Sequence, residues 1–179
     1  LIALNIDLIV QHVMRYVSEH NTERLTPVFD EENPIGATGQ MRTWYTTKPC
    51  FPAIKSHISH LVGDSSWEGH AANVFESRDD VVAYAKNDHL GFQIQYMWAG
   101  SRRRYVPDFL VRLSSGKMLA LEIKGTDSPQ NKAKRDALSE WVAAINGAGG
   151  FGQWAWDVAF KPGELQDIVS KHANSVTVA

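Results

Sequence analysis

Cysteine occurs once in this sequence, at Cys50, so the chain cannot form an internal disulfide. A lone cysteine is typical of proteins in a reducing compartment, and we predict a cytoplasmic location. No apolar run approaches the ~20 residues that cross a bilayer. Asp7 interrupts the apolar N-terminal stretch, which argues against a signal peptide. We therefore expect no association with a membrane.

An excess of positive charge is also missing. The 18 Lys and Arg residues are outnumbered by 20 Asp and Glu, which gives a net charge of -2. Because affinity for phosphates comes mainly from Lys and Arg, this composition argues against a self-sufficient nucleic-acid binder. The sequence also lacks internal repeats and a glycine-rich phosphate loop, which argues against a P-loop nucleotide site. The length of 179 residues predicts one domain.

The most informative stretch is Tyr105–Gly125, where two apolar runs flank a short polar loop and predict a β-hairpin. A three-residue loop at 114–116, with Gly116 in the left-handed conformation, would place Asp108 directly opposite Glu122. A two-residue loop would place these carboxylates on opposite faces, because a one-residue slip inverts the side-chain pattern. We favour the three-residue loop, since it also pairs apolar residues such as Phe109 and Leu121.

Asp108, Glu122 and Lys124 have no obvious structural use in a strand. Glu122 and Lys124 are two residues apart, so their side chains project from the same face. Two adjacent carboxylates repel each other unless a proton or cation lies between them, and carboxylate oxygens suit Mg²⁺. A lysine beside such a metal can hold a water or a phosphate oxygen, which favours phosphodiester hydrolysis. The alternative is a surface strand with a Glu–Lys pair and an Asp that ends a turn.

Pro107-Asp108 followed by Glu122-Ile123-Lys124 resembles the PD-(D/E)XK nuclease motif. Further segments are similar to the C-terminal nuclease region of helicase-fused restriction enzymes related to the type III restriction subunit. These segments are Lys55-Ser56-His57, Asp64 to Glu68, Lys86-Asn87 and Trp141-Val142. The resemblance covers the chain from Pro27 to Phe160, although the motifs outside the hairpin are individually weak.

The resemblance implies an α/β fold of the PD-(D/E)XK (restriction endonuclease-like) type, with a central mixed β-sheet flanked by helices in the order αβββαβ. We assign residues 64–179 to the nuclease core and residues 1–63 to an N-terminal helix and lead-in segment. Apolar spacing and turn residues predict helices at 4–17, 64–76, 129–146 and 162–172. Strands are expected at 92–98, 105–113, 117–125 and 154–160, with a short element at 79–86 and a possible strand at 41–47.

The same resemblance implies a Mg²⁺-dependent DNA endonuclease, with Mn²⁺ as a possible substitute. Asp108, Glu122 and the Ile123 carbonyl would bind the metal, and Lys124 would position the attacking water. The expected partners are double-stranded DNA and the helicase (ATPase) and specificity domains of a larger polypeptide or complex. Two alternatives stay open: a catalytically inactive nucleic-acid-binding or docking domain on the same fold, and a nuclease for RNA or single strands.

Members of this family often take a further metal-binding carboxylate from the helix before the hairpin, where Glu68 and Glu76 compete. They are eight residues apart, or ~12 Å along a helix, so both cannot reach one metal. We favour Glu68 and expect Glu76 to be solvated. Glu68 has an alternative role, because Ser65 followed by Glu68 forms a capping-box pattern.

Five basic residues are candidates for DNA contact. We expect three of them to lie between the strand at 92–98 and the Asp108 strand, and two at the start of the helix after Pro129, where an anion would offset their unfavourable position relative to the helix dipole. An ordinary solvated surface is the alternative for all five. The five residues are Arg102, Arg103, Arg104, Lys132 and Lys134.

Overall fold

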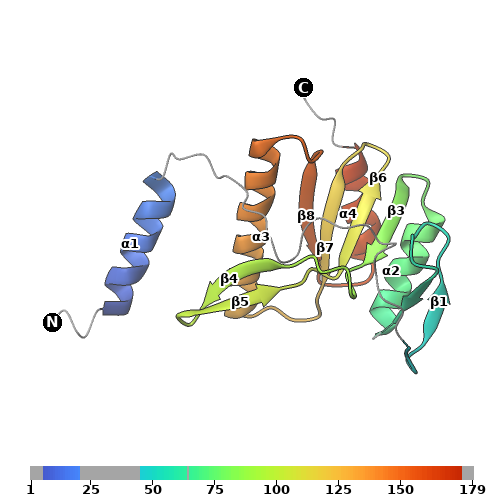
Figure 1. Cartoon of the computed structure of the whole chain (residues 1–179), viewed down its shortest axis with the longest axis horizontal. Coiled ribbons are helices and arrows are strands. Elements are labelled where there is room, and N and C mark those ends of the chain that lie inside the picture. The colour runs from blue at the N-terminus through green and yellow to red at the C-terminus, as the bar shows by residue number, and fades with distance from the viewer. Residues whose placement is uncertain (1–5, 21–44, 64, 175–179) are drawn as a thin grey trace.

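The computed structural model describes residues 6–20, 45–63 and 65–174 (Figure 1). None of the helices in these ranges is long and apolar enough to cross a bilayer. The elements in chain order are α1 (Ile6–His20), β1 (Cys50–Pro52), β2 (His60–Val62), α2 (Ser66–Ser77), β3 (Val81–Lys86), β4 (Ile94–Trp98), β5 (Ser101–Tyr105), β6 (Phe109–Leu113), β7 (Met118–Ile123), α3 (Pro129–Ala148), β8 (Trp154–Ala159) and α4 (Glu164–Asn174).

The central sheet has four strands in the order β3-β6-β7-β8. β6 is antiparallel to both β3 and β7, whereas β7 and β8 are parallel, so the sheet is mixed. β1 pairs with β2, and β4 pairs with β5, in two small separate sheets. The predicted α/β class with a mixed sheet is therefore confirmed.

Apolar side chains cover both faces of the sheet. Leu119 and Leu121 of β7 join the core formed with α2 and α4, whereas Ala120 joins the core formed with α3 and the β4–β5 ribbon. Figure 1 shows α3 and α4 on either side of the sheet. Because side chains alternate along a strand, Glu122 follows Ala120 onto the α3 side. The charged end of β7 is thus enclosed by α3 and the ribbon.

The expected place of the 92–98 strand in the central sheet is wrong. That strand exists as β4, but it pairs with β5 in a separate ribbon. The short element predicted at 79–86 instead supplies the outer strand β3, which pairs with β6 from Val81↔Leu113 to Lys86↔Phe109. Val81 and Tyr84 share the buried face because the register shifts between Val81 and Ala83, and both pack into the core with α2.

The predicted helices are present in the described residues. Ser65 caps α2 in a full capping box with Glu68, and Ser128 caps α3 before Pro129. The possible strand at 41–47 falls partly outside the described residues, and residues 45–47 form no strand. Leu61 of the lead-in segment packs into the core with α2. The division at 63/64 stays a prediction.

Candidate active site

The β6–β7 hairpin has the register predicted from the three-residue loop. The Leu113 N–H donates to the Lys117 carbonyl at 2.9 Å, and Gly116 has φ 82°. Phe109 pairs with Leu121, as expected. Asp108 lies one residue beyond this pair, which places it beside Glu122. The hairpin therefore brings the two carboxylates together at one end of the sheet.

Glu122 is buried, with only 7% of its surface exposed, and both of its carboxylate oxygens are hydrogen-bonded. The Tyr105 hydroxyl donates to Oε2 at 2.9 Å, and Lys124 Nζ donates to Oε1 at 3.0 Å. Burial, and next the charge of Glu122, raise the pKa of Tyr105, so its hydroxyl stays protonated as a donor. These contacts fix the orientation of Glu122 and confirm that Lys124 shares its face.

Asp108 is held by the neighbouring backbone. The Ile123 N–H donates to Asp108 Oδ2 at 2.7 Å, and the Asn87 N–H donates to the Asp108 backbone carbonyl at 2.8 Å. Burial, followed by the negative charge of Glu122, raises the pKa of Asp108 to about 7, although the Ile123 N–H opposes this. The pair therefore carries electrostatic repulsion that a bound cation would relieve.

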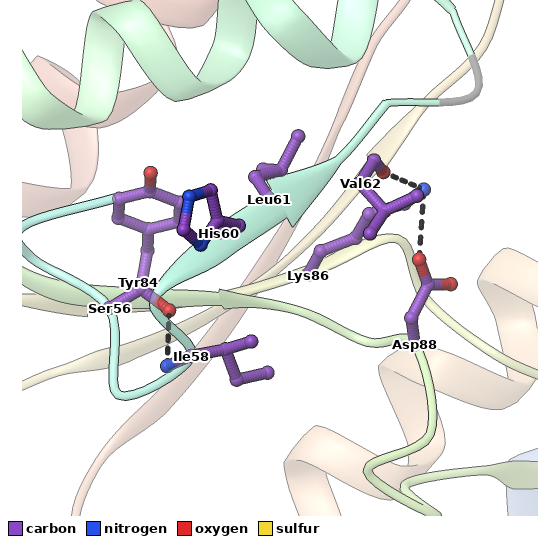
Figure 2. A pocket seen from close by; sticks show the side chains of 8 residues that line it. All are labelled: Ser56, Ile58, His60, Leu61, Val62, Tyr84, Lys86 and Asp88. Carbon is purple, nitrogen blue, oxygen red and sulfur yellow. Dashed lines mark hydrogen bonds and ion pairs between the residues drawn. The ribbon is translucent and has the colours of Figure 1, made fainter. Parts of the chain in front are cut away.

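The Glu68 carboxylate contacts Ser65 and Lys86. Its Oε2 accepts from the Ser65 N–H at 3.3 Å, within the capping box, and from Lys86 Nζ at 3.2 Å. Lys86 is buried, and its ammonium also reaches the Val62 carbonyl and the Asp88 carboxylate, at 2.9 and 3.0 Å (Figure 2). The charge of Glu68 contributes to the raised pKa of Asp108, so Glu68 lies near the carboxylate pair.

The expectation that Glu76 is solvated is wrong. Glu76 is half-buried and accepts hydrogen bonds from the Ile54 and Lys55 N–H groups and from the Tyr84 hydroxyl. Three donors compensate for an acid at the helix C-terminus, where it opposes the dipole. Glu76 therefore anchors the segment before β2 to α2 and β3.

The candidate DNA-binding residues divide between two elements. Arg102, Arg103 and Arg104 lie between the 92–98 strand and the Asp108 strand as expected, and they are exposed in β5, a strand that was not predicted. On α3, Lys134 Nζ lies 5.5 Å from the centroid of the Tyr105 ring and lines a small cavity with Glu122 and Lys124. The side chain of Lys132 is 72% exposed and pairs with Asp136 at 3.3 Å.

Three residues near the site had no assigned role in the sequence interpretation. Tyr105 orients Glu122, Lys86 holds Glu68, and Asn87 holds the Asp108 backbone while its side-chain amide donates to the Phe92 carbonyl. Lys86-Asn87 was visible only as part of the family resemblance. The burial of Lys86 becomes visible only in the structure, where its pairing with Glu68 and Asp88 compensates for it.

The donor set suits a hard divalent cation. The hairpin contributes only two carboxylates to the site, and among residues 6–20, 45–63 and 65–174 no group of three or more His, Cys, Asp and Glu residues is arranged to hold a metal. Asp108 and Glu122 supply two carboxylates, and the Ile123 carbonyl would supply a third oxygen. A site with so few protein oxygens fits Mg²⁺, which retains several waters. The raised pKa of Asp108 supports this fit.

Comparison with known proteins adds no family assignment: no family model, curated protein or solved structure matches the chain.

Proposed function

We propose that this chain is a Mg²⁺-dependent DNA endonuclease domain with a PD-(D/E)XK core. The observation that carries the proposal is the adjacency of Asp108 and Glu122 at one end of the sheet, with Lys124 3.0 Å from Glu122. Burying like charges together is unfavourable unless a ligand or function compensates. The motif resemblance supports the same activity, and its larger context suggests a cleavage module that works with helicase and specificity domains.

The side chains have distinct roles in this mechanism. Asp108, Glu122 and the Ile123 carbonyl would hold the metal, with Tyr105 and the Ile123 N–H keeping the carboxylates oriented. When bound, Mg²⁺ supplies Lewis-acid stabilisation of phosphate charge and lowers the pKa of water. Lys124 orients the attacking water and offsets negative charge on the phosphate in the transition state.

The test is cleavage of supercoiled plasmid in Mg²⁺, in Mn²⁺ and in EDTA. We expect Asp108→Ala, Glu122→Ala and Lys124→Ala each to abolish metal-dependent cleavage. Glu140→Ala, at an exposed position on α3, is the matched control and should cut normally. Cleavage by the Lys124 variant at the wild-type rate would contradict the proposed mechanism.

The substrate class is tested in parallel with duplex DNA, single-stranded DNA and RNA. Preferential cleavage of RNA or single strands would replace the DNA-duplex assignment while keeping the same site. Duplex binding without cleavage under any metal condition would favour the non-catalytic docking alternative. Repeating the assay with helicase and specificity domains in the same polypeptide tests whether those partners deliver the substrate.

A further inference from the structure

The β4–β5 ribbon is a tight two-stranded hairpin whose two faces differ. Ile94 pairs with Tyr105, and both are buried against α3 and the sheet. The alternate residues form the outer face of the ribbon, and all four are exposed. They are two cross-strand pairs, Gln95↔Arg104 and Met97↔Arg102.

The charged residues of the ribbon are all positive. Residues 94–105 include three arginines and no acidic residue, whereas the whole chain has a net charge of -2. Arg102 and Arg104 are two residues apart, so both project from the outer face, while Arg103 pairs with Tyr96 on the other. The ribbon is therefore positively charged, although the whole chain has more acidic than basic residues.

The ribbon is fixed relative to the candidate active site. Gln130 of α3 donates to the Tyr96 hydroxyl at 2.7 Å, and Tyr105, at the end of β5, donates to Glu122 at 2.9 Å. Arg104 directly precedes Tyr105, and Arg102 lies about 10 Å along the strand from it. Figure 1 shows the ribbon projecting past α3, away from the central sheet. The ribbon is therefore anchored to the site through Tyr105 on its buried face, while Arg102 and Arg104 lie on its exposed face.

We propose that the β4–β5 ribbon docks in the major groove of duplex DNA, with Arg102 and Arg104 facing the DNA. This inference rests on the proposed endonuclease function and identifies the part of the chain that holds its substrate. The major groove admits a two-stranded β-ribbon, whereas the minor groove is about half as wide. Arginine suits this position because its planar group binds phosphates and guanine edges in bidentate fashion.

The experiment compares Arg102→Ala/Arg104→Ala with the charge-matched control Arg112→Ala/Lys117→Ala, which removes two cations beside the β6–β7 loop. Fluorescence anisotropy measures binding to a duplex oligonucleotide in EDTA, over a range of salt. We expect the ribbon variant to lose about tenfold or more in affinity and to reduce the salt slope by about 1.8, since each phosphate contact contributes about 0.9. The control should bind within about twofold of wild type.

Several outcomes would overturn the proposal: equal loss in the control, unchanged binding by the ribbon variant, or tighter binding to single strands or RNA. Methyl green, which occupies the major groove, should compete with the protein. Competition by the minor-groove ligand netropsin instead would also overturn it.

Because binding in EDTA does not require the metal, the docking proposal and the endonuclease proposal are tested separately. If Asp108→Ala loses plasmid cleavage but the ribbon variant binds DNA normally, only the docking proposal is overturned. If Asp108→Ala still cleaves plasmid but the ribbon variant binds DNA weakly, only the endonuclease proposal is overturned.

Discussion

The hydroxyl of Tyr105 donates a 2.9 Å hydrogen bond to Oε2 of Glu122, and this contact joins the β4–β5 ribbon to the central sheet. A second tyrosine makes the same kind of contact elsewhere: the Tyr84 hydroxyl donates to Glu76 Oε1 at 3.0 Å. Tyr84 belongs to the core on the α2 face, whereas Tyr105 belongs to the core on the α3 face. The Tyr84–Glu76 contact is therefore a structural counterpart of the Tyr105–Glu122 contact at the candidate site, and the two can be compared by mutation.

Tyr105→Phe should reduce both stability and cleavage. The substitution removes a donor from a buried carboxylate oxygen, which we expect to cost about 1–2 kcal/mol of unfolding free energy. Glu122 also becomes less well oriented, and we expect about tenfold slower cleavage, equivalent to ~1.4 kcal/mol. Thermal unfolding and plasmid cleavage measure the two effects.

Tyr84→Phe is the matched control for this variant. It removes the same phenol–carboxylate hydrogen bond on the opposite face of the sheet, so it should lower the melting temperature similarly and leave cleavage unchanged. If both variants lose activity in proportion to their loss of stability, Tyr105 has no role beyond folding.

The Asp108 carboxyl predicts an unusual dependence of stability on pH. Burial and the charge of Glu122 raise its pKa to about 7, against roughly 4 in the unfolded chain. Between these values the folded state binds a proton that the unfolded state has released, so this group's contribution to stability falls as pH rises. Asp108→Asn removes the titration and keeps an acceptor for the Ile123 N–H.

We therefore expect Asp108→Asn, in EDTA, to raise the melting temperature by about 5 °C at pH 8 and by little at pH 4. Mg²⁺ should stabilise wild type at pH 8 and not the variant, because a bound cation relieves the same repulsion. Asp136→Asn, at an exposed position on α3, controls for loss of an ordinary carboxylate. A gain independent of pH would show that the repulsion is not its cause.

The tip of the β4–β5 ribbon contains backbone strain that one substitution can remove. Ala99 and Gly100 form its two-residue turn with φ 50° and 72°, and Ala99 is exposed. A non-glycine residue in this conformation costs about 1–2 kcal/mol, which glycine avoids at some entropic cost. Ala99→Gly should therefore raise the melting temperature by about 2 °C. Ala143→Gly, at an exposed position within α3, should lower it, because glycine weakens helices.

Local sequence chemistry determined much of the fold. The loop at 114–116 set the register of β6 and β7, and the Ser65 and Ser128 caps set the starts of α2 and α3. The place of β3 could not be read this way, because strand pairing depends on which partner edge is free. Residues 92–98 alternate more regularly than 81–86, yet the packing of Tyr84 against α2 places 81–86 in the central sheet.

The candidate site shows the same division. Asp108, Glu122 and Lys124 converge because they belong to one hairpin, and sequence spacing alone predicted this. Tyr105 and Lys86 approach the site from other strands, and their partners depend on tertiary packing. The sequence does not reveal that the Glu76 side chain is half-buried, because its three donors, Ile54, Lys55 and Tyr84, are distant in sequence or in a different element.

Glu68 combines a cap with a position near Asp108, and two substitutions separate these roles. Glu68→Gln keeps an acceptor for the Ser65 N–H but removes the charge that faces Lys86 and the carboxylate pair. If Glu68 contributes to metal binding, cleavage should fall about tenfold to 100-fold, with partial recovery at high Mg²⁺ or Mn²⁺. Ser65→Ala breaks the cap and leaves the charge, so it should cost about 1 kcal/mol of stability and little activity. Normal cleavage by Glu68→Gln would leave Glu68 as a cap alone, because glutamine serves a capping box equally well.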